Sequence, residues 1–174
     1  MIARRPGDPR AGALRDRHHV LFGGAPIPVP VDSIAADLLG LHVEEAEGLG
    51  VSGVLLPGLR TIRLDAGEAR EIPGRRRFTL AHEIGHWICH CAGTARQPAM
   101  LCRPAQVGAE GGDPLEREAN VFAAELLMPA AAVAAAVEGG APAPQLAERF
   151  GVSPIAFAWR LFNLGLADAP PLAE

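Results

Sequence analysis

Two histidines four residues apart, in the run His82-Glu83-Ile84-Gly85-His86, constrain this chain more than any other feature of its sequence. Apolar residues recur at helical spacing from Phe78 to about Cys91, which predicts a helix with Thr79 as its N-cap or first-turn residue. Residues four apart lie on the same face of a helix, so both imidazoles can reach one ion. Since zinc binds neutral imidazole, the run predicts a metal site on this helix.

Glu83 points in a different direction from the two imidazoles. It follows His82 by one residue and is therefore turned about 100° round the helix axis. From there its carboxylate reaches past a metal ion rather than onto it, which suits a general base that takes a proton from metal-activated water. The alternative is a helix that carries two solvated or core histidines and no metal.

A second predicted helix supplies a third ligand. Asp113-Pro114 opens this helix, because Asp caps and Pro suits the first position, and the helix runs to Met128. Glu116 is the candidate third ligand, and Asn120 on the same face can accept a hydrogen bond from the far ring nitrogen of a ligand histidine. The alternative for Glu116 is an acid stabilised by the helix dipole. Glu118 points to another side and is predicted to be a solvated acid.

The remaining pattern predicts an α+β fold with a small sheet. We expect helices over residues 32–39, 143–150 and 153–164, strands over 41–43, 51–56 and 60–64, and loops over 67–74 and 93–113. Residues 1–30 are rich in Arg, Pro and Gly and are expected to form a mobile N-terminal arm. The expected core is residues 31–140, followed by a C-terminal helical segment over 141–174.

Charge and residue usage argue against several classes of protein. The formal net charge of the 174 residues is -4, which disfavours a general nucleic-acid binder. The chain has no Lys, which excludes Schiff-base chemistry, and no Tyr. Its three cysteines lack the spacing of a disulfide framework, and it shows no signal peptide or membrane-spanning run. We therefore expect a reduced, cytoplasmic protein without membrane contact.

Three stretches of the chain, in this order, resemble the ImmA/IrrE family of zinc metallopeptidases. Residues 75–86, RRRFTLAHEIGH, resemble the start of the family's core motif. Residues 116–129, EREANVFAAELLMP, resemble its second motif almost throughout. Residues 146–153, LAERFGVS, and the stretch 160–166 match its C-terminal pattern, so the resemblance covers about residues 30–166.

This resemblance implies a zincin-like metallopeptidase core with a C-terminal, helix-turn-helix-like tail. It implies that His82, His86 and Glu116 hold zinc and that Glu83 is the base, although Mn²⁺ or Fe²⁺ also suits these ligands. It further implies a protein substrate, a helix-turn-helix repressor in a stress-response or mobile-element switch. The alternative is a non-catalytic zincin-like protein that binds a partner, as an antitoxin or regulator does.

Several side chains stay open in this interpretation. Cys89-His90-Cys91 with Cys102 resembles a metal cluster, but small core residues are favoured because the spacing is wrong for a structural zinc site. Without Tyr, the group that stabilises the oxyanion is one of the other histidines or an Arg. The histidine candidates are His18, His19, His42 and His90, with His90 favoured as a packing residue.

The C-terminal segment and an arginine run also allow two interpretations. Residues 153–164 offer a DNA reader only Arg160 and Asn163 among apolar side chains, so a packing or partner-binding helix pair is favoured and direct nucleic-acid binding is disfavoured. Arg75-Arg76-Arg77 is expected in a solvated loop, with substrate contact as the alternative.

Overall fold

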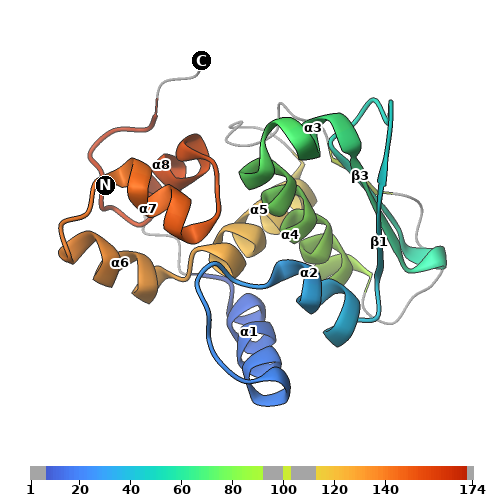
Figure 1. The fold of residues 1–174 in the computed structure, drawn as a ribbon, viewed down its shortest axis with the longest axis horizontal. Helices are drawn as coiled ribbons and strands as arrows, with labels where there is room; N and C mark the ends of the chain where they lie inside the picture. Colours follow the sequence, from blue (N-terminus) through green and yellow to red (C-terminus); the bar gives the residue numbers. More distant parts are fainter. Residues whose placement is uncertain (1–6, 92–99, 103–112, 172–174) are drawn as a thin grey trace.

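Two long helices, α4 (Pro73–His90) and α5 (Pro114–Leu127), lie side by side at the centre of the molecule (Figure 1). The computed structural model describes residues 7–91, 100–102 and 113–171. A small sheet lies on one side of the helix pair, and α6 (Ala130–Glu138), α7 (Ala143–Phe150) and α8 (Pro154–Asn163) lie on the other (Figure 1). The fold is α+β, as predicted.

The sheet contains four strands in the order β1-β3-β2-β4. They are β1 (His42–Ala46), β2 (Gly53–Leu56), β3 (Thr61–Asp65) and β4 (Met100–Cys102). β1 pairs with β3 in parallel, while β2 is antiparallel to both β3 and β4. Between β2 and β3 the chain makes a single 3-10 turn, η2 (Pro57–Leu59). The three predicted strands are present with slightly different ends, whereas β4 lies inside the predicted loop 93–113.

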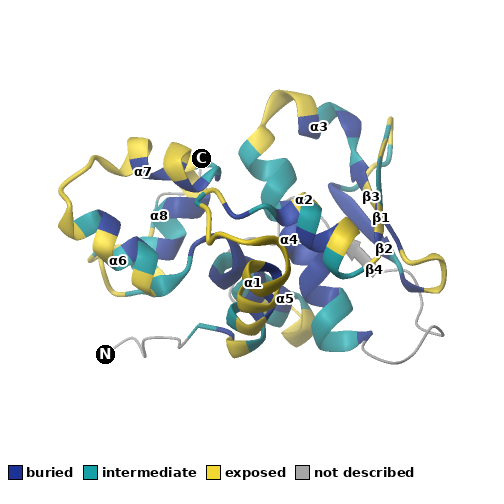
Figure 2. Ribbon diagram, turned by 60° about the horizontal axis from the view of Figure 1, so that its bottom comes forward, coloured by how far each residue is buried: buried dark blue, intermediate teal, exposed yellow. Residues whose placement is uncertain are grey.

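The core lies between α4, α5 and the inner face of the sheet. β3 alternates as predicted, with Ile62 and Leu64 buried and Arg63 exposed. α4 packs against β2 and β3, and its buried stretch is dark blue in the ribbon of Figure 2. Burying such apolar side chains is the main term that stabilises the fold, at about 25 cal/mol per Å². The largest fully buried side chains are Phe122, Phe150, Phe157, Ile34, Leu41, Leu55, Ile62, Leu64, Leu80, Ile84, Leu126 and Leu127.

The absence of a side chain at Gly85 allows α4 and α5 to approach each other closely. A Cβ atom there would lie 3.1 Å from both Cα and the carbonyl oxygen of Ala119, and 3.2 Å from the ring of Phe122. These separations are tighter than ordinary van der Waals contact. Gly85 and Ala119 therefore form the contact that brings the histidines of α4 to the first turns of α5.

Residues 9–22 contradict the predicted mobile arm, because they form helix α1 (Pro9–Phe22). The Asp8 side chain caps this helix by accepting from the Arg10 backbone N–H at 2.9 Å. Ala11 and Leu14 lie in the core, and α1 packs against α5. Asp8-Pro9 is the same start signal that predicted α5 at Asp113-Pro114, but the segment lacked a clear apolar period.

Other element boundaries also differ from the prediction. The predicted loop 67–74 contains α3 (Ala66–Glu71), which Asp65 caps and whose Ala69 is buried. The predicted helix over 32–39 divides into α2 (Val31–Ser33) and a π-helical turn, η1 (Ile34–Leu38). α6 was not predicted, because its Ala-rich sequence has little apolar period. α4 starts at Pro73, five residues before the predicted start at Phe78.

The arginine run 75–77 lies inside α4 and not in a loop. Arg75 pairs with Glu68 at 3.1 Å, and Arg76 contacts Asp32 at 2.8 Å and Glu45 at 2.7 Å. Arg77 donates to the carbonyl oxygens of Val29 and Gly151, at 2.6 and 3.0 Å. The three guanidinium groups thus join α4 to the surrounding elements.

The C-terminal helices α7 and α8 match the predicted segments. The rings of Phe150 and Phe157 stack between them, with their centroids 5.7 Å apart. Arg160 is buried, pairs with Glu125 of α5 and donates to the Met128 carbonyl at 2.9 Å. Glu125 also contacts Arg15 of α1. One of the two side chains considered for DNA contact is therefore used inside the molecule.

Within the described residues, no single helix is long and apolar enough to cross a membrane. α5 and α6 reach that length only together, with a bend of 52° between them.

Replacing Gly85 with Leu should lower the free energy of unfolding by about 1–3 kcal/mol, the usual cost of forcing extra atoms into a packed interface. Urea unfolding followed by circular dichroism measures this change. The matched control is Gly12→Ala in α1, where a new Cβ meets only the Arg15 guanidinium at 3.8 Å. Gly inside a helix costs roughly 0.5–1 kcal/mol relative to Ala, so the control should be at least as stable as the wild type. Wild-type stability of Gly85→Leu would contradict the role of this contact.

Candidate metal centre

His82 and His86 present their Nε2 atoms to each other from consecutive turns of α4. The two nitrogens lie 2.9 Å apart, and the rings meet edge to face. Both side chains are almost fully buried, with exposed fractions of 2% and 1%. The helix provides this alignment because residues four apart share one face.

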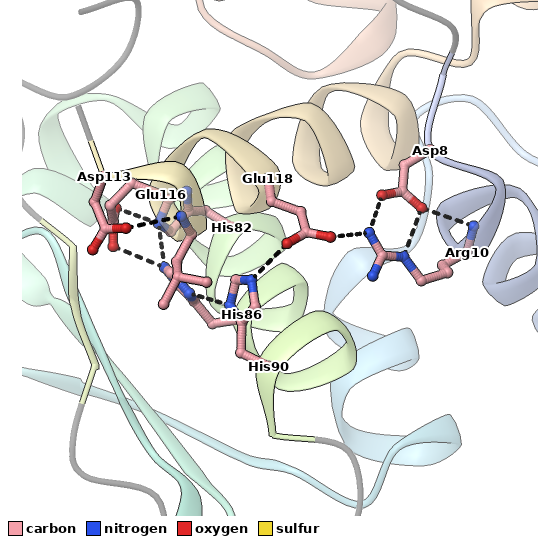
Figure 3. Close-up of polar contacts among 9 residues, drawn as sticks. Asp8, Arg10, His82, His86, His90, Asp113, Glu116 and Glu118 are labelled. Carbon is pink, nitrogen blue, oxygen red and sulfur yellow. Dashed lines mark hydrogen bonds and ion pairs between the residues drawn. The ribbon is translucent and has the colours of Figure 1, made fainter. Parts of the chain in front are cut away.

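Glu116 completes a group of three with these histidines. It lies in the first turn of α5, which Asp113 caps by accepting from the Leu115 backbone N–H. Its Oε1 is 3.1 Å from His86 Nε2 and its Oε2 is 3.2 Å from His82 Nε2 (Figure 3). Burial raises the pKa of Glu116, but hydrogen bonds and charge from the two histidines lower it to about 2. Glu116 is therefore a carboxylate at neutral pH.

The outer nitrogen of each histidine has a partner that determines its protonation. His82 Nδ1 lies 2.9 Å from the Asn120 side-chain oxygen, which can only accept, so Nδ1 carries the proton. His86 Nδ1 lies 3.0 Å from His90 Nδ1, and His90 Nε2 lies 3.0 Å from Glu118 Oε2. Because the carboxylate accepts from His90 Nε2–H, a neutral His90 accepts from His86 Nδ1–H. In the neutral form of each histidine, which is the form that binds a metal, the lone pair is then on Nε2.

These three side chains fit a divalent cation. Two imidazole lone pairs and one carboxylate converge within 4.8 Å, an arrangement in which the groups repel one another unless protons or a cation lie between them. Tetrahedral ligands 2.0–2.2 Å from a zinc ion are roughly 3.4 Å apart, close to the separations between these atoms. Two His and one carboxylate form a ligand set of catalytic zinc, which leaves a fourth position for water or substrate.

Glu83 is fully buried beside this group, on the side that faces the sheet. Its Oε1 would be 3.1 Å from a Cβ at Gly53 of β2, so only glycine fits there without movement. Neither carboxylate oxygen makes a well-formed hydrogen bond within the described part of the chain. Burial raises the pKa of Glu83 well above its usual value, the charge of Glu116 raises it further, and the Leu55 backbone partly offsets both effects. The position and pKa of this group suit proton transfer.

The structure thus brings together the four side chains that the sequence singled out for metal binding and proton transfer, and places Asn120 behind His82. Two expectations about neighbouring residues are wrong. Glu118 is not simply a solvated acid, since it contacts His90 and Arg10, and His90 contacts His86 instead of only packing. The spacing of His86 and His90, again four residues, was the available signal for the second of these contacts.

The cysteine run does not form a second site among the described residues. Cys89 and Cys91 are reduced thiols, and burial raises the pKa of both, to about 11 for Cys89. The side chain of Cys102 lies outside the described residues. Thiols with raised pKa are poor metal ligands at neutral pH, which agrees with the favoured interpretation of core residues.

The histidines considered for oxyanion stabilisation have other contacts or positions. His90 lies behind His86, and His18 is buried against the Ser33 hydroxyl at 3.0 Å. His42 is on β1, at the opposite edge of the sheet from β4, and His19 is exposed on α1. The described residues therefore do not identify the oxyanion donor.

Residues 59–162, more than half of the chain, match a peptidase family model described as the IrrE N-terminal-like domain. The chain belongs to this family. No curated protein matches the chain.

Membership of the IrrE-like family confirms the resemblance to ImmA/IrrE metallopeptidases and supports a metallopeptidase-type function. The match includes β3, α4, α5 and all side chains of the candidate metal centre. It does not include α1, β1 or β2. The part of the molecule that lies outside the match thus contains Gly53, against which Glu83 packs, and Arg10, which contacts Glu118.

The purified chain should bind one divalent transition metal, and Glu116→Ala should abolish stoichiometric binding. Loss of a ligand should weaken binding by more than the 10–100-fold that is typical of outer partners. Elemental analysis after dialysis against a weak chelator measures metal per chain. Glu148→Ala on the exposed face of α7 is the matched control and should retain the wild-type content. Equal metal content in the Glu116 variant would contradict its role as a ligand.

Proposed function

We propose that this chain is a zinc-dependent endopeptidase. The observation that carries the proposal is the position of a buried carboxyl group, Glu83, beside a group of two histidines and a carboxylate. This set of side chains occurs in a member of a peptidase family. Zinc is the metal best suited to these ligands, and Mn²⁺ and Fe²⁺ are the alternatives.

His82, His86 and Glu116 would hold the metal. The protein orients these side chains before the metal binds. Each imidazole is aligned by a hydrogen bond on its far nitrogen, so little reorganisation is required when the site is loaded. When bound, the metal would act as a Lewis acid that polarises the scissile carbonyl and acidifies water.

Glu83 would move the protons. Its carboxylate accepts a proton from the attacking water and returns that proton to the amine that leaves. Both transfers are efficient when the pKa of the base lies near the working pH, and burial raises the pKa of Glu83 in this direction. Gly53 permits this carboxyl group to approach β2.

The proposed substrate is a helix-turn-helix repressor, cleaved in a stress-response or mobile-element switch. The support for this choice is the family membership and the resemblance of the two motifs on α4 and α5 to ImmA/IrrE peptidases. Direct DNA binding is not part of the proposal, because Arg160 on α8 is buried against Glu125. Location in the cytoplasm likewise stays a prediction.

A non-catalytic, partner-binding protein is the second candidate. The observation in its favour is the unidentified oxyanion donor: the chain has no Tyr, and His18, His42 and His90 have other contacts. Such a protein would bind its partner through the same fold without cleaving it.

Glu83→Gln should lower cleavage of the repressor by about 10²–10⁴-fold, the usual contribution of general acid–base catalysis. Metal content should stay near that of the wild type, and stability should not fall, because the substitution removes a buried carboxyl group that lacks a well-formed hydrogen bond. Gel electrophoresis of a purified helix-turn-helix repressor incubated with this chain measures cleavage.

Glu148→Gln is the matched control and should cleave at the wild-type rate. Full cleavage by Glu83→Gln would contradict the proposed mechanism. If the wild type binds the repressor without releasing product, and Glu83→Ala binds it equally well, the non-catalytic function is supported instead.

A further inference from the structure

A continuous chain of polar contacts connects helix α1 to His86. Arg10 Nη2 donates to Glu118 Oε1 at 2.6 Å, and Glu118 Oε2 accepts from His90 Nε2 at 3.0 Å. His90 Nδ1 in turn lies 3.0 Å from His86 Nδ1 (Figure 3). The contacts thus cross from α1 to α5 and then to α4.

The Arg10 side chain, at one end of this series of contacts, is held in place by Asp8. The same Nη2 of Arg10 contacts Asp8 Oδ2 at 2.6 Å, and Arg10 Nε donates to Asp8 Oδ1 at 3.0 Å. Asp8 also caps α1, and α1 is fixed on α5 by the buried Ala11 and Leu14. The position of the guanidinium group is therefore set by the docking of the whole helix.

Glu118 lies where it can influence the imidazoles. Its Oε1 pairs with the Arg10 guanidinium, and its Oε2 faces His90 Nε2. An ionised carboxylate can only accept, so it fixes the proton of His90 on Nε2 and leaves Nδ1 to accept from His86. With this proton on Nδ1, the lone pair of a neutral His86 lies on Nε2, the atom that faces His82 and Glu116.

The two histidines of the metal centre thus have different outer partners. His82 contacts the neutral amide of Asn120 directly. His86 contacts a second imidazole that is backed by a carboxylate and an arginine.

We infer that Glu118 and His90 are positioning residues for His86, and that Arg10 makes α1 part of the metal centre by holding Glu118. Contacts with α1, outside the family match, thereby tighten metal binding. The inference rests on the proposed binding of a metal by His82, His86 and Glu116.

Zinc affinity of the full-length chain, measured by competition with a chelating indicator, tests the inference. His90→Leu and Glu118→Leu should each weaken zinc binding by about 10–100-fold. Arg10→Ala should weaken it less, by about 3–10-fold, because the Arg10 and Glu118 side chains are each 40% exposed and solvent replaces part of the contact. Arg17→Ala, an exposed arginine on the same helix, is the matched control and should leave affinity unchanged.

Two further variants separate positioning from a general loss of structure. His90→Gln keeps an acceptor for His86 and a donor for Glu118, so it should restore most of the affinity that His90→Leu loses. Adding Arg10→Ala to Glu118→Leu should cause no additional loss, because the arginine acts through the carboxylate. The same variants should unfold at wild-type temperature without metal, and only the rise in unfolding temperature on adding zinc should shrink.

The outcomes distinguish this inference from the proposed function. A wild-type chain that binds no zinc contradicts both. A wild-type chain that binds zinc, with all three single variants binding equally tightly, contradicts the inference alone. Independent and additive losses from Arg10→Ala and Glu118→Leu would also overturn it, since they would show that the arginine does not act through Glu118. Because Arg10 is half-exposed, Arg10→Ala should fold, and it still tests the inference if a His90 variant does not fold.

Discussion

The close approach of α4 and α5 at Gly85 and Ala119 is the constraint on which the rest of the structure depends. Two of the candidate metal-binding side chains belong to α4 and the third to α5, so their separation follows from the distance between the helix axes. One added carbon atom at Gly85 would crowd Ala119 and Phe122, because packed interiors have little free volume. Sheet, C-terminal helices and α1 all pack around this pair and hold it in place.

The polar groups in this interior differ in how they are satisfied. Arg160, Glu125 and Arg15 form a fully paired cluster, whereas Glu83 is buried without a well-formed hydrogen bond within the described residues. A buried carboxyl group of this kind lowers stability, which is common for groups at functional sites. The contrast between the two sets separates side chains that hold the fold together from the candidate proton-transfer group.

Sequence predicted those parts of the molecule that depend on local rules. The spacing of His82 and His86, and the start signal at Asp113-Pro114, were enough to place three metal-binding candidates on two helices. The same signal at Asp8-Pro9 was not used, because α1 shows little amphipathic period and is stabilised mainly by docking on α5. Contacts such as Arg10 with Glu118, 108 residues apart, depend on how helices dock and have no local signature. The short strand β4 was missed for a similar reason, since pairing with β2 defines it.

The cluster of Arg15, Glu125 and Arg160 also has a consequence for the order of folding. Arg15 contacts α5 across 110 residues of sequence, so α1 is synthesised long before the surface that receives it. Contacts at such separations carry a large loop-closure entropy and form late. During synthesis, the apolar side chains of α1 therefore stay exposed to water until α5 has been made. Arg160 of α8 is the last charged partner of Glu125 to be synthesised. The cluster around Glu125 is therefore completed only when early and late parts of the chain meet on α5.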